Sequence, residues 1–484
     1  MSDDWSALEG RALPAWFDDA KLGIFLHWGL YSVPGWAART ADIQTMMREG
    51  PEKLLRDNPY AAWYANTMRI DGSPTQEYHA QTYGSGFPYP SFAEEFDRQS
   101  AGADLDELAE LCARGGARYV VLTTKHHEGY CLWPSEQRHP RMGEYHSSRD
   151  LVGDMTEAVR RAGMRMGLYY SGGYDWPWND AVIKSAPDMV LATPEGDYVD
   201  YAEAHVRELI HGYEPAVLWN DVCWPAGGNL PGLFEEYYET VPDGVINDRW
   251  RQSSRSYVGD AVTRVAGLVA QAAWRLLPDK TRSLTFPTAG HYDFATPEYA
   301  QKDSIEAKKW ESTRGIGHAF AFNRNEDVSQ ALTVTELVRT FVDIVSKNGN
   351  LLLGIGPRAD GTIPEWQQEV VLGLGSWLAV NGEAVFGTRP FDVSSGSTAD
   401  GTDVRFTRTG ESVYAVLLGT PGQKQVRIRG LRAEGLIGAV LLGYGQVPVV
   451  EHADSVEVTL PDRLPTAPAH AVRLTPASAV QSVS

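Results

Sequence analysis

The chain contains few cysteines and no long apolar run. Its 484 residues include only three cysteines, Cys112, Cys131 and Cys223, which are widely spaced and form no CxxC pair. This set predicts neither a disulfide framework nor a structural zinc site. No segment approaches 18 consecutive apolar residues, so we expect a globular chain without a membrane span and no membrane partner.

Basic residues are outnumbered by acidic ones, 43 against 63, which gives a formal net charge of −20. Such a chain repels nucleic acid phosphates and anionic lipids, so no nucleic-acid partner is expected and a small neutral or cationic ligand is favoured. The N-terminus lacks the basic and apolar regions of a secretory signal, which predicts a cytoplasmic location. The sequence leaves open whether the protein is a homo-oligomer.

Between residues 20 and 250, short apolar runs alternate with helical patterns. Strands are predicted at residues 22–29, 118–127, 164–173, 216–221 and 244–250. Helices are predicted at residues 104–117, 150–163 and 198–213. This alternation predicts a parallel sheet, and because neither a GxGxxG motif nor a P-loop occurs, it favours a TIM-like (β/α) barrel of the α/β class.

Past residue 390 the pattern changes to alternating apolar and polar residues between glycine-rich turns. This pattern predicts a small antiparallel β-sandwich. We therefore expect a catalytic barrel domain over residues 1–389 and a C-terminal domain over residues 390–484. Residues 251–290 interrupt the barrel pattern as an insertion of unknown role, with a helix predicted at 259–279.

The predicted strands end in polar and titratable residues. In a (β/α) barrel the functional groups lie at the carboxyl ends of the strands, which meet at one pocket. That rule selects His27, His126, His127, Tyr169, Tyr170, Asp221, Asp248 and Arg249.

Asp221 follows a buried strand in the stretch AVLWNDVCWP. A carboxylate there either caps the following loop or serves as a nucleophile or general base, as in glycoside cleavage. Glycoside cleavage needs a second carboxyl group, and periodicity does not choose among the candidates Asp293, Glu298, Glu306 and Glu311.

The pair His126 and His127, with His27, is open to three interpretations. Metal ligation is disfavoured because adjacent residues on a strand point to opposite faces, and no HExxH motif occurs. The alternatives are buried structural histidines and ligands for sugar hydroxyl groups.

Several motifs together resemble glycoside hydrolase family 29, the α-L-fucosidases. They run in order from about residue 14 to 390: WFDDAKLGIFLHWGLYSVPGWA, YVVLTTKHHEGYCLW, GLYYSGGYDW, VLWND, INDRW, TPEY, KWESTRGIGHAFAFNRNED and LLLGIGPRADGTIP. The resemblance implies a retaining exo-glycosidase that removes terminal α-L-fucosyl residues and requires no cofactor and no metal.

The resemblance also implies roles for individual residues. Asp221 corresponds to the nucleophile and Glu298 to the general acid/base, with Glu311 as the second choice. The residues that correspond to ligands of the sugar hydroxyls and to aromatic contacts around the sugar are His27, Trp63, His126, His127, Tyr169, Trp219, Arg249, Phe25 and Phe320.

Two pocket positions depart from the bacterial members of the family, which carry Trp near Leu54 and Glu at Ala62. Because a hydrogen bond to a charged group contributes roughly 1.5 to 3 kcal/mol, losing this Glu weakens fucose binding unless a neighbour substitutes. A related α-L-glycoside is therefore an alternative substrate, and an inactive carbohydrate-binding protein is a further one.

Overall fold

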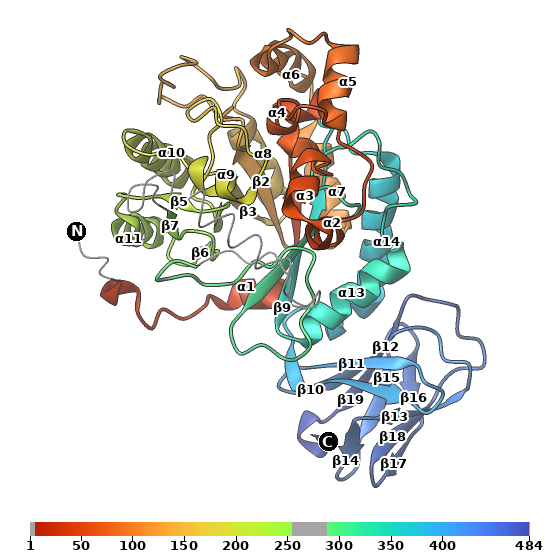
Figure 1. The fold of residues 1–484 in the computed structure, drawn as a ribbon. Helices are drawn as coiled ribbons and strands as arrows, with labels where there is room; N and C mark the ends of the chain where they lie inside the picture. The colour runs from red at the N-terminus through yellow and green to blue at the C-terminus, as the bar shows by residue number, and fades with distance from the viewer. Residues whose placement is uncertain (1–4, 254–287, 484) are drawn as a thin grey trace.

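A seven-stranded parallel sheet forms the centre of the computed structural model, which describes residues 5–253 and 288–483 (Figure 1). The strand order is β6-β4-β3-β2-β1-β9-β8. The strands are β1 (Leu22–Leu26), β2 (Tyr119–Lys125), β3 (Arg165–Tyr170), β4 (Val217–Asn220), β6 (Val245–Ile246), β8 (Trp310–Gly315) and β9 (Gly349–Ile355). The helix predicted at residues 259–279 lies outside the described residues.

An irregular segment joins the two edges of this sheet. Asn247, just past β6, forms a parallel bridge with Phe294, and Ala295 forms one with Trp310 of β8. Residues 293–298 thus stand where an eighth strand would stand, and the sheet closes. The prediction of a (β/α) barrel is confirmed.

Helices pack around the barrel. The predicted helices at residues 104–117, 150–163 and 198–213 are α7 (Leu105–Arg114), α8 (Leu151–Arg161) and α10 (Tyr198–Tyr213). α7 and α8 begin where an Asp side chain accepts a hydrogen bond from a backbone amide of the first turn. The others are α1 (Ala15–Ala20), α2 (Ile43–Glu49), α3 (Pro51–Arg56), α4 (Tyr64–Thr67), α5 (Pro74–Thr82), α6 (Phe92–Ser100), α9 (Ala186–Leu191), α11 (Leu230–Thr240), α13 (Val334–Ser346) and α14 (Glu365–Asn381). Of these, α2 and α3 contribute to the pocket at the carboxyl end of the barrel.

Successive residues of each barrel strand point to opposite sides. In β3, Leu168 and Tyr170 belong to the core between sheet and helices, whereas Tyr169 belongs to a second core inside the barrel. In β4, Leu218 packs outward and Trp219 inward in the same way. Aromatic residues therefore fill the barrel beneath its carboxyl end, as in a packed core rather than a pore.

The observed strands are shorter than the predicted ones, chiefly at their carboxyl ends. β2 ends at Lys125 and β4 at Asn220, so that His126 and Asp221 lie just beyond the ladder. β8 and β9 were not predicted as strands. Both are buried, and β8 has the sequence WESTRG, in which the inward-facing Glu311 and Thr313 are polar and hide the usual apolar signal.

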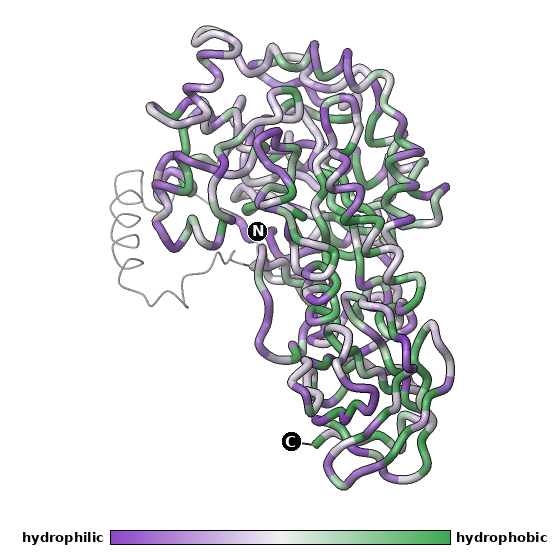
Figure 2. The backbone as a smooth tube through the Cα atoms, turned by 90° about the vertical axis from the view of Figure 1, so that its right-hand side faces the viewer, coloured by the Kyte–Doolittle hydropathy of each residue, from purple (hydrophilic) through white to green (hydrophobic). Residues whose placement is uncertain are grey.

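The C-terminal part is an antiparallel β domain that lies below α13 and α14 in Figure 1, and Figure 2 shows the C-terminus at the same end of the molecule. Nine strands form one continuous sheet in the order β16-β15-β19-β12-β11-β10-β13-β18-β17, around a core of its own, and β14 pairs with β20. The strands are β10 (Arg389–Thr398), β11 (Asp403–Arg408), β12 (Val413–Leu417), β13 (Gln425–Arg429), β14 (Leu431–Ala433), β15 (Gly438–Leu441), β16 (Gly445–Val447), β17 (Val449–His452), β18 (Ser455–Thr459), β19 (His470–Thr475) and β20 (Val480–Ser482).

Buried polar bonds attach this domain to the barrel helices. The Trp377 indole Nε1 donates to the Ala469 carbonyl at 2.9 Å, and Arg405 Nε contacts Asp343 Oδ1 at 2.6 Å. The boundary between residues 389 and 390 remains a prediction, although β10 starts at Arg389. In the described ranges, no helix is both long and apolar enough to span a bilayer.

Candidate active site

One pocket opens at the carboxyl ends of the barrel strands and brings together residues from most of the chain up to position 321. No described residue of the C-terminal domain contributes to its lining. The pocket is lined by the eleven residues that the resemblance implies as nucleophile, first-choice acid/base and sugar contacts: Phe25, His27, Trp63, His126, His127, Tyr169, Trp219, Asp221, Arg249, Glu298 and Phe320.

Asp221 lies one residue past β4, where the chain turns inward. Its Oδ2 accepts a hydrogen bond from the Tyr169 hydroxyl at 2.8 Å, and its Oδ1 accepts from Arg249 Nη1 at 2.8 Å. Burial raises the pKa of this carboxyl, but the Arg249 charge and the Tyr169 hydrogen bond outweigh burial and hold the pKa below the ordinary 3.8. Asp221 is therefore an ionised carboxylate.

Glu298 comes from the irregular segment that closes the barrel. Its Oε1 accepts from the same Arg249 Nη1 at 2.7 Å, and its Oε2 accepts from the Tyr60 hydroxyl at 3.4 Å. Since bonds of 2.8 Å and 2.7 Å share one nitrogen, the Asp221 and Glu298 oxygens lie at most about 5.5 Å apart. Retaining glycosidases space their two carboxyl groups about 5 to 5.5 Å apart, which this upper limit allows.

Arg249 is held in place by buried contacts to Thr296. Its Nε donates to Thr296 Oγ1 at 3.0 Å and its Nη2 donates to the Thr296 carbonyl at 2.9 Å. Its guanidinium lies 4.7 Å from the centre of the Trp219 ring. Arg249 is therefore a rigid cation between the two carboxylates.

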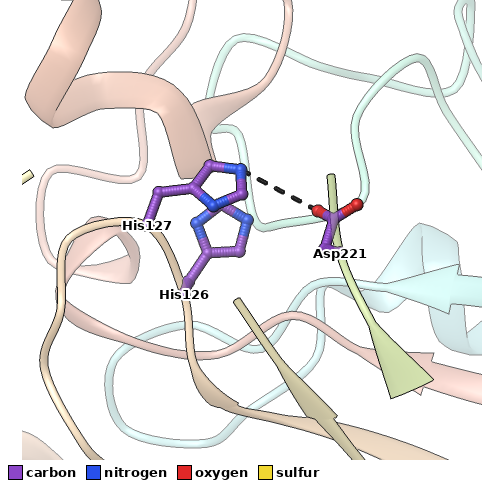
Figure 3. A group of neighbouring side chains, drawn as sticks. All are labelled: His126, His127 and Asp221. Carbon is purple, nitrogen blue, oxygen red and sulfur yellow. Dashed lines mark ion pairs between the residues drawn. The ribbon is translucent and has the colours of Figure 1, made fainter. Parts of the chain in front are cut away.

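The two adjacent histidines both reach the pocket, as Figure 3 shows. The expectation of opposite faces applies only within a strand, whereas both residues follow the end of β2, where the register with β3 shifts. Their ring centres are 4.0 Å apart, and His127 Nε2 lies 3.8 Å from Asp221 Oδ2.

Hydrogen bonding fixes the tautomer of His127. The Ser171 hydroxyl donates its only proton to the Tyr174 carbonyl at 2.9 Å, so it accepts from His127 Nδ1 at 2.6 Å. Burial lowers the pKa of His127 well below its ordinary range, which keeps the ring neutral. Its Nε2 is thus an unprotonated acceptor that faces Asp221 and suits a ligand hydroxyl group.

His126, His127 and Asp221 also meet a geometric criterion for metal binding, with ligand atoms within 4.8 Å of one another (Figure 3). However, both Asp221 oxygens already accept hydrogen bonds, and the Arg249 cation contacts one of them. A second cation at this place would be repelled by Arg249, so the geometry favours a catalytic carboxylate over a metal ligand.

Glu311, the second choice for the acid/base, does not line the pocket. Its strand β8 points this side chain into the barrel, where it is fully buried and accepts hydrogen bonds from the Tyr119 hydroxyl and the Trp219 indole. Burial raises its pKa to about 7. Glu311 thus lies beneath Trp219, on the side away from the pocket.

Sequence reasoning also selected two strand-end residues that lie elsewhere, and it overlooked Tyr60. Tyr170 points outward and contacts His205, while Asp248 accepts hydrogen bonds from the amide and hydroxyl of Thr296. Tyr60 lies two residues before Ala62 in NPYAAWY, and only its aromatic character beside Trp63 could have indicated it.

Comparisons with known proteins agree with this arrangement. The sequence profile of the α-L-fucosidases matches residues 1–383. The chain belongs to the α-L-fucosidase family, glycoside hydrolase family 29. An α-L-fucosidase of Dictyostelium discoideum is 30% identical over 94% of this chain and 89% of that protein.

Solved structures extend the likeness to the fold. The Thermotoga maritima α-fucosidase in complex with fucose is 38% identical, covers 98% of this chain and 99% of its own, and has a TM-score of 0.81. An α-L-fucosynthase of the same organism, in complex with α-L-Fuc-(1-2)-β-L-Fuc-N3, has the same identity and coverage and a TM-score of 0.84. Leu54 and Ala62, at the positions where the resemblance implies Trp and Glu, line the pocket of this chain with apolar side chains.

Proposed function

We propose that this family member hydrolyses terminal α-L-fucosides with retention of configuration. The observation that carries the proposal is the single Arg249 nitrogen bonded to both carboxylates, which sets the spacing of a two-carboxylate double displacement. Solved relatives bind fucose and a fucosyl azide disaccharide, which supports fucose as the sugar.

In the first step Asp221 attacks the anomeric carbon while Glu298 donates a proton to the departing glycosidic oxygen. The bond to the leaving group breaks as the ester bond to Asp221 forms. In the second step Glu298 takes a proton from water, whose oxygen displaces Asp221. Glu298 thus changes from acid to base between the two steps, as a retaining mechanism requires.

The surrounding groups hold the sugar. His127 accepts from a hydroxyl group near the nucleophile, and the neutral His27, whose pKa burial lowers well below its ordinary range, offers one donor and one acceptor. Phe320 stacks on His27, with the ring centres 5.0 Å apart and an angle of 25° between the ring planes. Phe320 therefore offers an aromatic face to the sugar beside His27. The set of proposed sugar contacts is completed by Trp63, His126, Tyr169, Trp219, Arg249 and Phe25.

Turnover of a panel of 4-nitrophenyl α-L-glycosides tests the sugar. We expect kcat/KM for the fucoside to exceed that for any other L-sugar by at least about tenfold, because one buried polar contact contributes about that factor. A preference for another L-sugar would favour the alternative substrate that Leu54 and Ala62 suggest. If the enzyme cleaves no glycoside of the panel, the remaining hypothesis is an inactive carbohydrate-binding protein.

The acidic limb of the pH profile tests Asp221. The pKa of Asp221 lies below 3.8 in the folded protein. As the pH is lowered, protonation of Asp221 should therefore reduce kcat/KM only below pH 3.8. Tyr169→Phe removes a hydrogen bond to the ionised form and should move the limb up by about one pH unit. Tyr170→Phe, whose hydroxyl contacts His205 outside the barrel, is the matched control and should not move it.

A further inference from the structure

The pocket has an apolar outer part that the reaction steps do not use. Six side chains form it, and we call them the apolar collar: Met47, Pro51, Leu54, Leu55, Met189 and Val222. Every charged residue and histidine among the described lining residues lies instead at the catalytic end. Met47, Met189 and Val222 are partly exposed, whereas the other three are buried, so the collar runs from the mouth inward.

The collar lies beside both catalytic carboxylates. α2, which carries Met47, is tied to the acid/base because Gln44 Nε2 donates to the Glu298 carbonyl at 2.8 Å. On the opposite side, Val222 directly follows the nucleophile, and its amide donates to Asp221 Oδ1 at 2.8 Å. The collar residues and both carboxylates line one pocket, so a group attached to the oxygen that Glu298 protonates can contact these side chains.

Val222 is held in an unusual conformation. Its φ of +67° is in the left-handed region, which a β-branched residue rarely adopts. The turn aims the Val222 amide at the nucleophile and directs the side chain into the pocket, against the cluster that contains Leu55 and Met189. Glycine would orient the same amide without strain, so the isopropyl group points to a contact with a ligand.

We propose that the apolar collar is the leaving-group subsite and that it selects α-L-fucosides with an apolar alkyl or aryl aglycone. This inference rests on the proposed function and specifies its substrate class. A sugar aglycone presents hydroxyl groups, and the collar offers them no donor or acceptor side chain. Two methionines adapt to different apolar shapes, so the subsite accepts a range of such groups.

The test compares kcat/KM for methyl and butyl α-L-fucoside. Both alcohols are leaving groups of similar acidity, so the chemical step is matched and only the buried apolar length differs. This constant reports the step in which the leaving group is still attached. We expect the butyl fucoside to react at least about tenfold faster than the methyl fucoside, because three more methylene groups become buried.

Two variants locate the effect. Met189→Gln keeps the side-chain length but adds polar atoms, and Val222→Gly removes the isopropyl group while keeping the amide. Both should bring the butyl to methyl ratio toward one. Val190→Gln is the matched control, because Val190 is 43% exposed and does not line the pocket, so its ratio should equal that of the wild type.

The results of these measurements distinguish a failure of the subsite proposal from a failure of the proposed fucosidase function. If both fucosides are cleaved at equal rates, or if Met189→Gln keeps the wild-type ratio, the fucosidase assignment stands and the subsite proposal is overturned. The same holds if an α-L-fucosyl galactoside is cleaved faster than the butyl fucoside. If no fucoside is cleaved at all, the proposed function fails and this inference fails with it.

Discussion

Asp221→Gly should lower kcat/KM for an aryl α-L-fucoside by more than about 10³-fold, because it removes the group that forms the covalent intermediate. Added azide should restore turnover. A small anion fits the space left by the carboxylate, and its nitrogen bonds to the anomeric carbon as the aglycone departs. The product should be β-L-fucosyl azide, inverted relative to the substrate, which NMR identifies.

The control for this experiment is a substituted acid outside the pocket. The Asp180 side chain is 81% exposed, and Asp180→Gly should keep wild-type activity with no response to azide. An Asp221→Gly enzyme that keeps more than a tenth of its activity, or that loses activity and yields no azide adduct, would contradict the assignment of Asp221 as nucleophile. Circular dichroism of each variant separates lost chemistry from lost folding.

Glu298→Ala should produce a loss that depends on the leaving group. An alkyl fucoside needs proton donation and should lose about 10³-fold in kcat/KM, near the upper part of the range for general acid catalysis. With a 4-nitrophenyl fucoside, 4-nitrophenolate departs without that proton, so the rate of the first step should fall far less. The measured quantity is the ratio of the two losses, which a structural defect alone would not change.

Glu311→Gln is the matched comparison. With a pKa raised to about 7 by burial, Glu311 is largely protonated at moderately acidic pH, and Gln reproduces that neutral shape between Tyr119 and Trp219. We expect less than about a tenfold loss, equal for both leaving groups. If the dependence on leaving group followed Glu311 instead of Glu298, the acid/base assignment would have to be exchanged.

Much of the catalytic centre is predictable because strand period and barrel geometry act together. An apolar run fixes where a strand ends, and the parallel barrel directs the next residue to one pocket, which His27, His126 and Asp221 all line. The same reasoning selected Tyr170 wrongly. Tyr170 is still part of β3, and the alternation of side chains along the strand turns it outward, into the core between sheet and helices.

The second carboxylate was beyond this reasoning. Glu298 lies on an irregular segment with no periodic pattern, and its proximity to Asp221 depends on Arg249, a contact between distant parts of the chain. Glu311 lies on β8, which was not predicted as a strand because its sequence, WESTRG, is mostly polar. The apolar collar was missed for a related reason: short helices outside the barrel repeat carry it, and their apolar residues read as ordinary core.

The packed interior beneath the pocket has a consequence for the order of events. Tyr119, Trp219 and the buried Glu311 fill the barrel, so in the described part of the chain the sugar end of the pocket is closed and the mouth is its open side. The aglycone must leave before water can reach the intermediate. During that interval an alcohol with an apolar tail can occupy the vacated mouth, so the same architecture that releases fucose is suited to transferring it to a new acceptor.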